Sequence, residues 1–227
     1  MLNKTMNKNI LIIGYGDIGS RLSKKLKEQS ANIYAVSRYD SSDQNIVKIN
    51  WDWLSKKKLE LPKVIFDSVI IIPKPNSLDE AGYNDGFILS TKNIVNSLQN
   101  VNIKNVIAIS STRVYGDHQK GPINEETLVE PSDFRGRFIK DYESLLNKSF
   151  TNNLNILRFS GLYKEDSEHI SHNRLNRDTA ANIISFVIDK LSGNEANSIY
   201  NCSEDSEILE STKSIRNDKL KKAGFKF

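Results

Sequence analysis

A glycine run between two apolar segments carries the clearest chemical signal in this sequence. The run consists of Gly14, Tyr15, Gly16, Asp17, Ile18 and Gly19, and it fits the pattern G-x-G-x-x-G. It follows the apolar stretch 9–13, which is expected to be a buried strand, and it opens a segment whose apolar residues recur at helical spacing. This context is typical of a site that binds phosphate groups.

Each glycine of such a turn has a physical task. The first permits a tight turn, the second lets a diphosphate approach the backbone, and the third lets the helix pack closely on the strand. Free N–H groups at the start of the helix then bind the phosphates. The run therefore predicts a dinucleotide site, and the alternative is a strand–helix turn that holds no ligand.

The end of the next expected strand, 32–37, distinguishes between two dinucleotides. NAD sites usually place Asp or Glu about 20 residues beyond the glycines, where the carboxylate binds the ribose hydroxyls. Ser37 occupies this position and Arg38 follows it. A carboxylate would repel the 2′-phosphate of NADP, whereas serine and arginine can hydrogen-bond to it and neutralise it. NADP is the expected cofactor, although Asp40 could serve NAD if the strand ends later, with Arg38 then a surface arginine.

Strand and helix patterns alternate along nearly the whole chain. Expected strands cover 9–13, 32–37, 46–49, 69–72, 105–110, 154–159 and 198–201, and helical spacing marks 18–26, 87–98, 134–145 and 183–191. Ser132 is a candidate cap for the third helix. The alternation predicts an α/β fold, with a doubly wound, mainly parallel Rossmann sheet and helices on both faces, in a single domain over 1–227. After Cys202 the chain is largely polar, which predicts a small, poorly packed appendage.

Composition limits the class of protein. The 227 residues suffice for a core without disulfides or a structural metal. The net charge of +4 is scattered, so no nucleic-acid partner is expected. Cys202 is the only cysteine, which fits a reducing cytoplasm. A polar N-terminus and strand-sized apolar runs predict neither a signal peptide nor a membrane span, and hence a cytoplasmic protein with no membrane partner.

The segment from Ser110 to Gly116 reads Ser-Ser-Thr-Arg-Val-Tyr-Gly. It resembles the extended short-chain dehydrogenase/reductase family, also called NAD-dependent epimerase/dehydratases, which carries Ser-Ser/Thr-x-x-Val-Tyr-Gly at this strand end. Segments 157–163, 173–178 and 200–201 add further matches, so the resemblance spans roughly residues 10–203. It implies NAD(P) binding, a reduced substrate-side lobe within 160–227, and a homodimer formed through helices around 83–98 and 133–146. Burial of these two helices against their own sheet explains their apolar stripes equally well.

Two departures set this chain apart from the family pattern. The family pairs a tyrosine with a lysine four residues later on one helical face, and the lysine lowers the tyrosine pKa for proton transfer. Alignment on Glu143 places Arg135 at the tyrosine position and Ile139 at the lysine position. The family also spaces its glycines G-x-x-G-x-x-G, which would require glycine at Ile13. The chain thus resembles a divergent branch that lacks Tyr-x-x-x-Lys.

The resemblance nevertheless implies roles for several residues. Ser111 keeps the position of the catalytic hydroxyl that orients a substrate, with a polar strand end as the alternative. Arg135 and Arg174 are candidate substrate ligands, and their alternatives are a solvated helix arginine and a surface salt bridge. Asp52 matches an acid near the adenine, or is a loop carboxylate, and Pro73 matches a position beside the cofactor.

No metal site is expected. His169 and His172 are three residues apart, as metal ligands on a helix could be, but no Cys accompanies them and only Glu165 and Glu168 lie nearby. Loop residues near a substrate pocket are the favoured interpretation of this pair.

Two functions follow from these observations. The first is an NADP-dependent oxidoreductase or nucleotide-sugar epimerase/dehydratase-like enzyme acting on a small substrate, nucleotide-linked or carbonyl. The second is a non-catalytic NADP(H)-binding sensor or scaffold of the same fold, which the missing Tyr-Lys pair favours.

Overall fold

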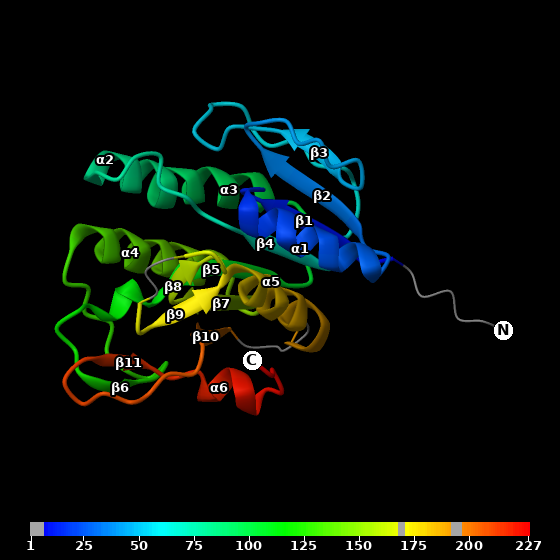
Figure 1. Ribbon diagram of the computed structural model, residues 1–227. Coiled ribbons are helices and arrows are strands. Elements are labelled where there is room, and N and C mark those ends of the chain that lie inside the picture. The colour runs from blue at the N-terminus through cyan, green and yellow to red at the C-terminus, as the bar shows by residue number, and fades with distance from the viewer. Residues whose placement is uncertain (1–6, 168–170, 192–196) are drawn as a thin grey trace.

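Seven parallel strands form the main sheet in the order β10-β7-β5-β4-β1-β2-β3 (Figure 1). The computed structural model describes residues 7–167, 171–191 and 197–227. The strands are β1 (Asn9–Ile13), β2 (Asn32–Ser37), β3 (Val47–Asn50), β4 (Ser68–Ile71), β5 (Val106–Ser111), β7 (Leu154–Phe159) and β10 (Ser198–Cys202). All seven strands expected from sequence are confirmed, with ends that differ by one residue at most.

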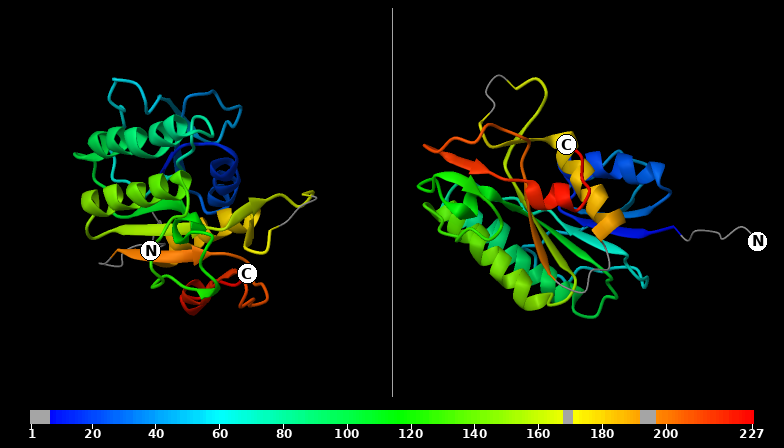
Figure 2. Two further views of the ribbon diagram at one scale, coloured as in Figure 1. Left: turned by 90° about the vertical axis from the view of Figure 1, so that its left-hand side faces the viewer. Right: turned by 90° about the horizontal axis from the view of Figure 1, so that it is seen from below.

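Helices cover both faces of this sheet, as predicted for a doubly wound Rossmann fold (Figures 1 and 2). One face carries α1 (Asp17–Glu28) and α5 (Arg177–Phe186), which continues as a π-helical turn, η3 (Val187–Leu191). The other face carries α4 (Phe134–Ser149) and a continuous helical segment made of α2 (Glu80–Tyr83), the π-helical turn η1 (Asn84–Leu89) and α3 (Ser90–Leu98).

Alternation along the strands explains the two layers. In β1, Ile10 and Ile12 belong to the core under α1 and α5, whereas Leu11 and Ile13 belong to the core under α3 and α4. All four side chains are fully buried. Successive strand residues point to opposite faces, so an unbroken apolar run is what a strand covered on both faces requires.

Short elements beyond the carboxyl edge of the sheet were not predicted. They comprise the 3₁₀ turn η2 (Thr112–Tyr115), the parallel pair β6 (Gly121–Ile123) and β11 (Lys213–Ile215), and the parallel pair β8 (Gly161–Tyr163) and β9 (Arg174–Asn176). Each strand has only three residues, which is too short for a period-two pattern to stand out. The range 160–227 holds most of these strands, but it also contains α5 and β10, which belong to the main layers.

Two local predictions were wrong. The cap of α4 is Asp133, whose carboxylate accepts a hydrogen bond from the Gly136 N–H at 2.8 Å, while the Ser132 hydroxyl accepts one from the Asp117 N–H. The segment after Cys202 is not poorly packed, because Ile215 and Leu220 are buried in the two main cores. A few buried apolar side chains anchor this segment, and they are too sparse to stand out in its largely polar composition.

No helix within the described ranges is both long and apolar enough to cross a membrane.

Leu220 tests whether the C-terminal segment is integral to the fold. It lies in α6 (Asp218–Lys222) with no exposed surface. Replacing it with alanine should lower the free energy of unfolding by about 2–5 kcal/mol, because a buried cavity would form. Urea unfolding of Leu220→Ala and of the exposed control Lys222→Ala measures this. Equal midpoints for the two variants would contradict an integral role.

Candidate functional site

Two adjoining cavities open at the carboxyl edge of the sheet. The smaller has a volume of about 160 Å³ and the larger about 590 Å³, and Ile72 lines both. They lie where the chain leaves β1 and β4, the adjacent strands whose connections run to opposite sides of the sheet. Such a switch point is where open α/β sheets bind ligands.

Gly14 and Gly16 shape the wall of the smaller cavity. Gly14 has φ +89°, and a Cβ there would lie 2.2 Å from the carbonyl oxygen of Ile72. Only glycine fits both this backbone conformation and this close approach. Gly16 is different, because a Cβ on it would meet no atom within 4 Å. The absence of a side chain at Gly16 therefore has no packing reason within the protein.

Helix α1 begins directly after Gly16, at this wall. Gly16 is the N-cap, and no side chain caps the helix. The N–H groups of Gly14 and Tyr15 bind the Val36 carbonyl oxygen, at 3.1 and 3.0 Å, whereas the first N–H groups of a helix have no partner inside it. These donors and the empty space beside Gly16 fit a diphosphate.

Among the other residues of the glycine run, Tyr15 lines the smaller cavity, and Asp17, Ile18 and Gly19 do not. The Tyr15 hydroxyl hydrogen-bonds to Ser23 at 2.8 Å, and the ring lines the cavity. Ile18 lines the larger cavity, and Gly19 keeps α1 close to Ile12 of β1. Asp17 points away to ion pairs.

Asp17 links the starts of α1 and α5. Its carboxylate accepts hydrogen bonds from Arg177 at 2.7 Å and from Arg21 at 3.1 Å. Partial burial raises the Asp17 pKa, but the two arginines outweigh it and leave that pKa below its usual value. Asp17 can thus contribute its backbone N–H to a cofactor, while its side chain fixes two helices.

Ser37 and Arg38 line the smaller cavity, as a 2′-phosphate site would require. The Ser37 hydroxyl oxygen accepts a hydrogen bond from the Tyr39 N–H at 3.1 Å. Arg38 donates to the side-chain oxygen of Asn76 at 3.2 Å, and its guanidinium lies 5.6 Å from the centre of the Tyr39 ring. No carboxylate from the described residues lines this cavity, and Asp40 borders a separate small pocket behind it.

Asp52 lies outside both cavities, whereas Pro73 lines the larger one. The Asp52 carboxylate accepts a hydrogen bond from the Leu54 N–H at 2.9 Å and does not line the cavity, so its role near an adenine stays a prediction. Its neighbours Trp51 and Trp53 do line the cavity, and sequence reasoning missed them. Pro73 lines the larger cavity beside Ile72.

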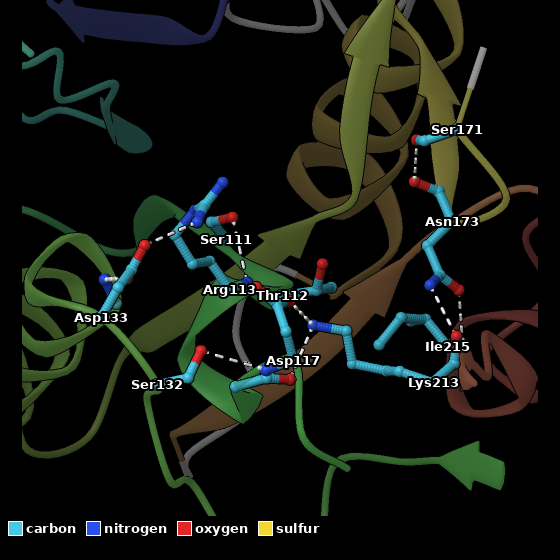
Figure 3. Close-up of polar contacts among 12 residues, drawn as sticks. Ser111, Thr112, Arg113, Asp117, Ser132, Asp133, Ser171, Asn173, Lys213 and Ile215 are labelled. Atoms are coloured by element: carbon cyan, nitrogen blue, oxygen red, sulfur yellow. Dashed lines mark hydrogen bonds and ion pairs between the residues drawn. The ribbon is translucent and has the colours of Figure 1, made fainter. Parts of the chain in front are cut away.

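Ser111 stands at the larger cavity, at the end of β5. Its hydroxyl oxygen accepts a hydrogen bond from the Arg113 N–H at 3.2 Å and caps the turn η2 (Figure 3). This bond uses the oxygen as an acceptor and leaves the O–H free to donate. A substrate carbonyl or hydroxyl in the cavity could receive that proton in a hydrogen bond.

A buried polar network lies beneath this cavity. Arg158 of β7 donates to both carboxylate oxygens of Glu143 at 2.9 and 2.7 Å, and Glu143 accepts a further bond from Ser110 at 2.5 Å. Burial lowers the Arg158 pKa, but its bonds to Glu143 outweigh this and raise that pKa overall. The network joins α4 to β5 and β7 and holds the strand end that carries Ser111.

Tyr115 belongs to this network and not to the cavity. Its hydroxyl accepts a bond from Arg158 at 2.8 Å and donates to Asn201 at 2.9 Å. The side chain is fully buried, and burial raises its pKa. Tyr115 is therefore a structural residue and not a catalytic base.

The positions of the family's tyrosine and lysine carry no acid–base pair. Ile139 lines the larger cavity, so an apolar side chain faces this cavity at the position that the resemblance assigns to the lysine. Arg135 does not line the cavity, and its guanidinium lies 5.6 Å from the Phe134 ring centre and 6.0 Å from that of Tyr83. Arg174 also lies off the cavity wall and pairs with Glu204 at 3.4 Å. Substrate binding by Arg135 or Arg174 stays a prediction.

Sequence reasoning missed two basic residues at the larger cavity, Arg113 and Lys213, whereas His172 lines it as expected of a loop residue near a pocket. Arg113 lies within the Ser-Ser-Thr-Arg segment, two residues after Ser111, and that proximity was an available signal. Lys213 had none, because its strand β11 has only three residues. His169 lies outside the described residues. Across the described parts of the chain, no group of three or more His, Cys, Asp or Glu could hold a metal ion.

Comparison with solved structures gives proteins of the same fold. A candidate NAD-dependent epimerase/dehydratase from Methylobacillus flagellatus superposes with a TM-score of 0.74 at 18% identity, over 98% of this chain and 93% of that one. UDP-N-acetylglucosamine 4-epimerase from Bacillus cereus gives 0.74 at 16% identity, over 96% and 93%. UDP-glucuronic acid 4-epimerase from Bacillus cereus, solved in complex with NAD, gives 0.72 at 17% identity, over 92% and 87%.

No curated protein sequence matches this chain at a significant level. The model of the NAD dependent epimerase/dehydratase family matches residues 10–137, which is more than half of the chain. That match covers the glycine turn, Ser37 at the end of β2 with Arg38 after it, and the Ser-Ser-Thr-Arg-Val-Tyr-Gly segment. The chain belongs to the NAD dependent epimerase/dehydratase family.

Proposed function

We propose that this protein is an NADP-dependent oxidoreductase or epimerase-like enzyme that acts on a small carbonyl or nucleotide-linked substrate. The observation that best supports this proposal is the pair of adjoining cavities at the switch point. One lies beside the uncapped N-terminus of α1, and the other lies beside Ser111. When bound, a nicotinamide dinucleotide supplies hydride transfer. Structural relatives that bind NAD and nucleotide sugars support this assignment, among them a protein named MoeE5 in complex with UDP-glucose and NAD.

Residues of the smaller cavity would bind the cofactor, and residues of the larger cavity would orient the substrate. Gly16 and the first turn of α1 would hold the diphosphate, while Ser37 and Arg38 would bind the 2′-phosphate. Ser111 would orient a substrate oxygen by donating its O–H. Ile139 and Phe159 line the same cavity and would keep water from part of the substrate.

Preference for NADP over NAD rests on the charges around the smaller cavity. Arg38 and Lys74 line it, and the described residues place no carboxylate there. A 2′-phosphate would find cations and a hydroxyl, whereas ribose hydroxyls would lack the acidic partner that NAD sites usually supply.

A homodimer and a cytoplasmic location also belong to this proposal. The helices α3 and α4 lie side by side on one face, where the resemblance implies a four-helix bundle, and Leu89 beside them is 41% exposed (Figure 1). Cys202 is a free, buried thiol, which fits a reducing compartment.

Two glycine variants should separate binding from folding. Gly16→Ala should keep its melting temperature and lose roughly tenfold or more in affinity for NADPH, because the added methyl occupies space that only a ligand would use. Gly14→Ala should lower the melting temperature, because its methyl meets the Ile72 carbonyl. Trp51 and Trp53, the only tryptophans, both line the cavity, so quenching of protein fluorescence by NADPH reports binding. Full affinity in Gly16→Ala would contradict the proposed diphosphate position.

Arg38→Asp tests the choice of cofactor. The affinity for NADPH should fall by roughly tenfold or more, since a charge-assisted hydrogen bond contributes about 1.5–3 kcal/mol, and preference should shift towards NADH. Lys24→Asp, an exposed α1 residue with the same charge change, is the matched control. Unchanged NADPH affinity in Arg38→Asp would show that Arg38 does not contact the 2′-phosphate.

Turnover distinguishes the enzyme from the non-catalytic alternative. We expect purified protein to oxidise NADPH with members of a panel of carbonyl compounds, or to interconvert UDP-sugars with NAD(P) present. Ser111→Ala should lower kcat by roughly tenfold or more while leaving the NADPH affinity unchanged, because Ser111 lies only at the substrate cavity. Tight NADPH binding without any turnover across both panels would instead favour the sensor or scaffold.

A further inference from the structure

The polar end of the larger cavity carries charged groups that the proposed roles leave unused. Arg113 and Lys213 line this end, with His172 nearby on the same wall. Asp117 is the only carboxylate among the described lining residues. The remaining polar lining consists of hydroxyl and amide side chains, so the ionised groups of this wall have a positive balance.

Arg113 is held in place by a single partner. Its Nη1 donates to Asp133 at 2.8 Å, and the other Asp133 oxygen caps α4 by accepting the Gly136 N–H at 2.8 Å (Figure 3). Asp133 is thus fixed by the helix, and it fixes the guanidinium in turn. Among the described residues no other acceptor binds Arg113, whose side chain is 41% exposed. Most of its five N–H donors remain free for a ligand.

Lys213 reaches the cavity from β11, far along the chain. Its ammonium donates to the Gly116 carbonyl oxygen at 2.8 Å and to Asp117 at 3.0 Å, and the side chain is only 13% exposed. The bond from Lys213 lowers the Asp117 pKa, so this carboxylate stays ionised. Two acceptors leave one ammonium N–H available.

Asn173 ties the loop that carries His172 to the same strand. Its amide nitrogen donates to the Lys213 carbonyl oxygen at 2.7 Å, and its amide oxygen accepts the Ile215 N–H at 2.8 Å (Figure 3). His172 itself hydrogen-bonds to Ser214 at 3.3 Å. Arg113, His172 and Lys213, here called the basic wall, are thus each held by at least one hydrogen bond: Arg113 to Asp133, His172 to Ser214, and Lys213 to the Gly116 carbonyl and Asp117.

The chemistry of these groups indicates binding and not proton transfer. An arginine remains protonated in proteins, so Arg113 cannot replace the missing tyrosine as an acid or base. Its planar fork of donors instead matches the two oxygens of a carboxylate or phosphate. Ser111 lies two residues away on the same cavity wall, so a bound anion would place the adjoining substrate atoms near that hydroxyl.

We propose that this end of the larger cavity binds an anionic group of the substrate, a carboxylate or a phosphate, with Arg113 as its main ligand and Lys213 as a second. The proposal rests on the proposed function, because it names the class of substrate that the same site takes. A purely structural Arg113 that only joins η2 to α4 is the competing account.

Matched ligand pairs test the proposal. Pyruvate and methyl pyruvate differ by one carboxylate charge, and dihydroxyacetone phosphate and dihydroxyacetone differ by a phosphate. Calorimetric titration into the full chain saturated with NADP⁺ measures binding without reduction of the carbonyl. In at least one pair, the anion should bind about tenfold or more tightly than its neutral partner, and the pair affected identifies the anion. No preference in either pair would overturn the proposal.

Variants then assign the preference to Arg113. Arg113→Gln should abolish the preference for the anion over its neutral partner. Arg113→Lys should keep part of that preference, because the positive charge remains while the planar set of guanidinium donors is lost. Arg137 lies on the helix that Asp133 caps, and its side chain is 61% exposed. The control variant Arg137→Gln should keep the full preference for the anion. Survival of the preference in Arg113→Gln would overturn the assignment. The wild-type comparison stands even if Arg113→Gln fails to fold.

The fluorescence titration with NADPH separates this proposal from the proposed function. If NADPH binds and the anions show no preference, the anion site fails and the dinucleotide site stands. If NADPH does not bind, the proposed function fails, and titration of the same ligand pairs into cofactor-free protein still decides the anion site.

Discussion

The close approach of the β1–α1 turn to the end of β4 governs the geometry of the whole site. The Gly14 Cα sits where any side chain would collide with the Ile72 carbonyl, so the two chain segments touch at the switch point. This contact turns the chain sharply out of β1 and aims the start of α1 along the carboxyl edge of the sheet. Because Ile72 then borders both cavities, a molecule that extends past it would reach from Arg38 on one side to Ser111 on the other.

A second constraint acts below the cavity. The buried pair of Glu143 and Arg158 fixes α4 against β5 and β7. The same helix presents an apolar side chain, Ile139, to the larger cavity. Fold alone does not determine which reaction such a site supports.

The sequence was a reliable guide where the signal lies within a short stretch of neighbouring residues. Apolar runs located all seven main strands, and the glycine run together with Ser37 and Arg38 identified residues that line one cavity. The resemblance to the family identified Ser111, which lines the larger cavity. These features are local, since each can be recognised within a few residues of chain.

What could not be predicted depends on contacts between distant segments. Trp51 and Trp53 line a cavity because β3 ends beside β2, and Lys213 does so because a three-residue strand returns to Gly121. The packing of the C-terminal segment was mispredicted for the same reason. A few inward-facing residues such as Leu220 are enough to anchor it, although its overall composition is polar.

The pairing of β6 with β11 has a consequence for the order in which the protein folds. Residues 121–123 and 213–215 are separated by most of the second half of the chain, whereas the first cavity is built from residues 14–74. Contacts between distant residues form slowly, because a long loop must close before they are made. We therefore expect residues 14–74, which build the smaller cavity, to be organised early, and the wall of the larger cavity that includes Lys213 to form last. Until 213–215 pairs with 121–123, the chain lacks the strand that brings Lys213 to the larger cavity, so the last pairing to form completes that wall.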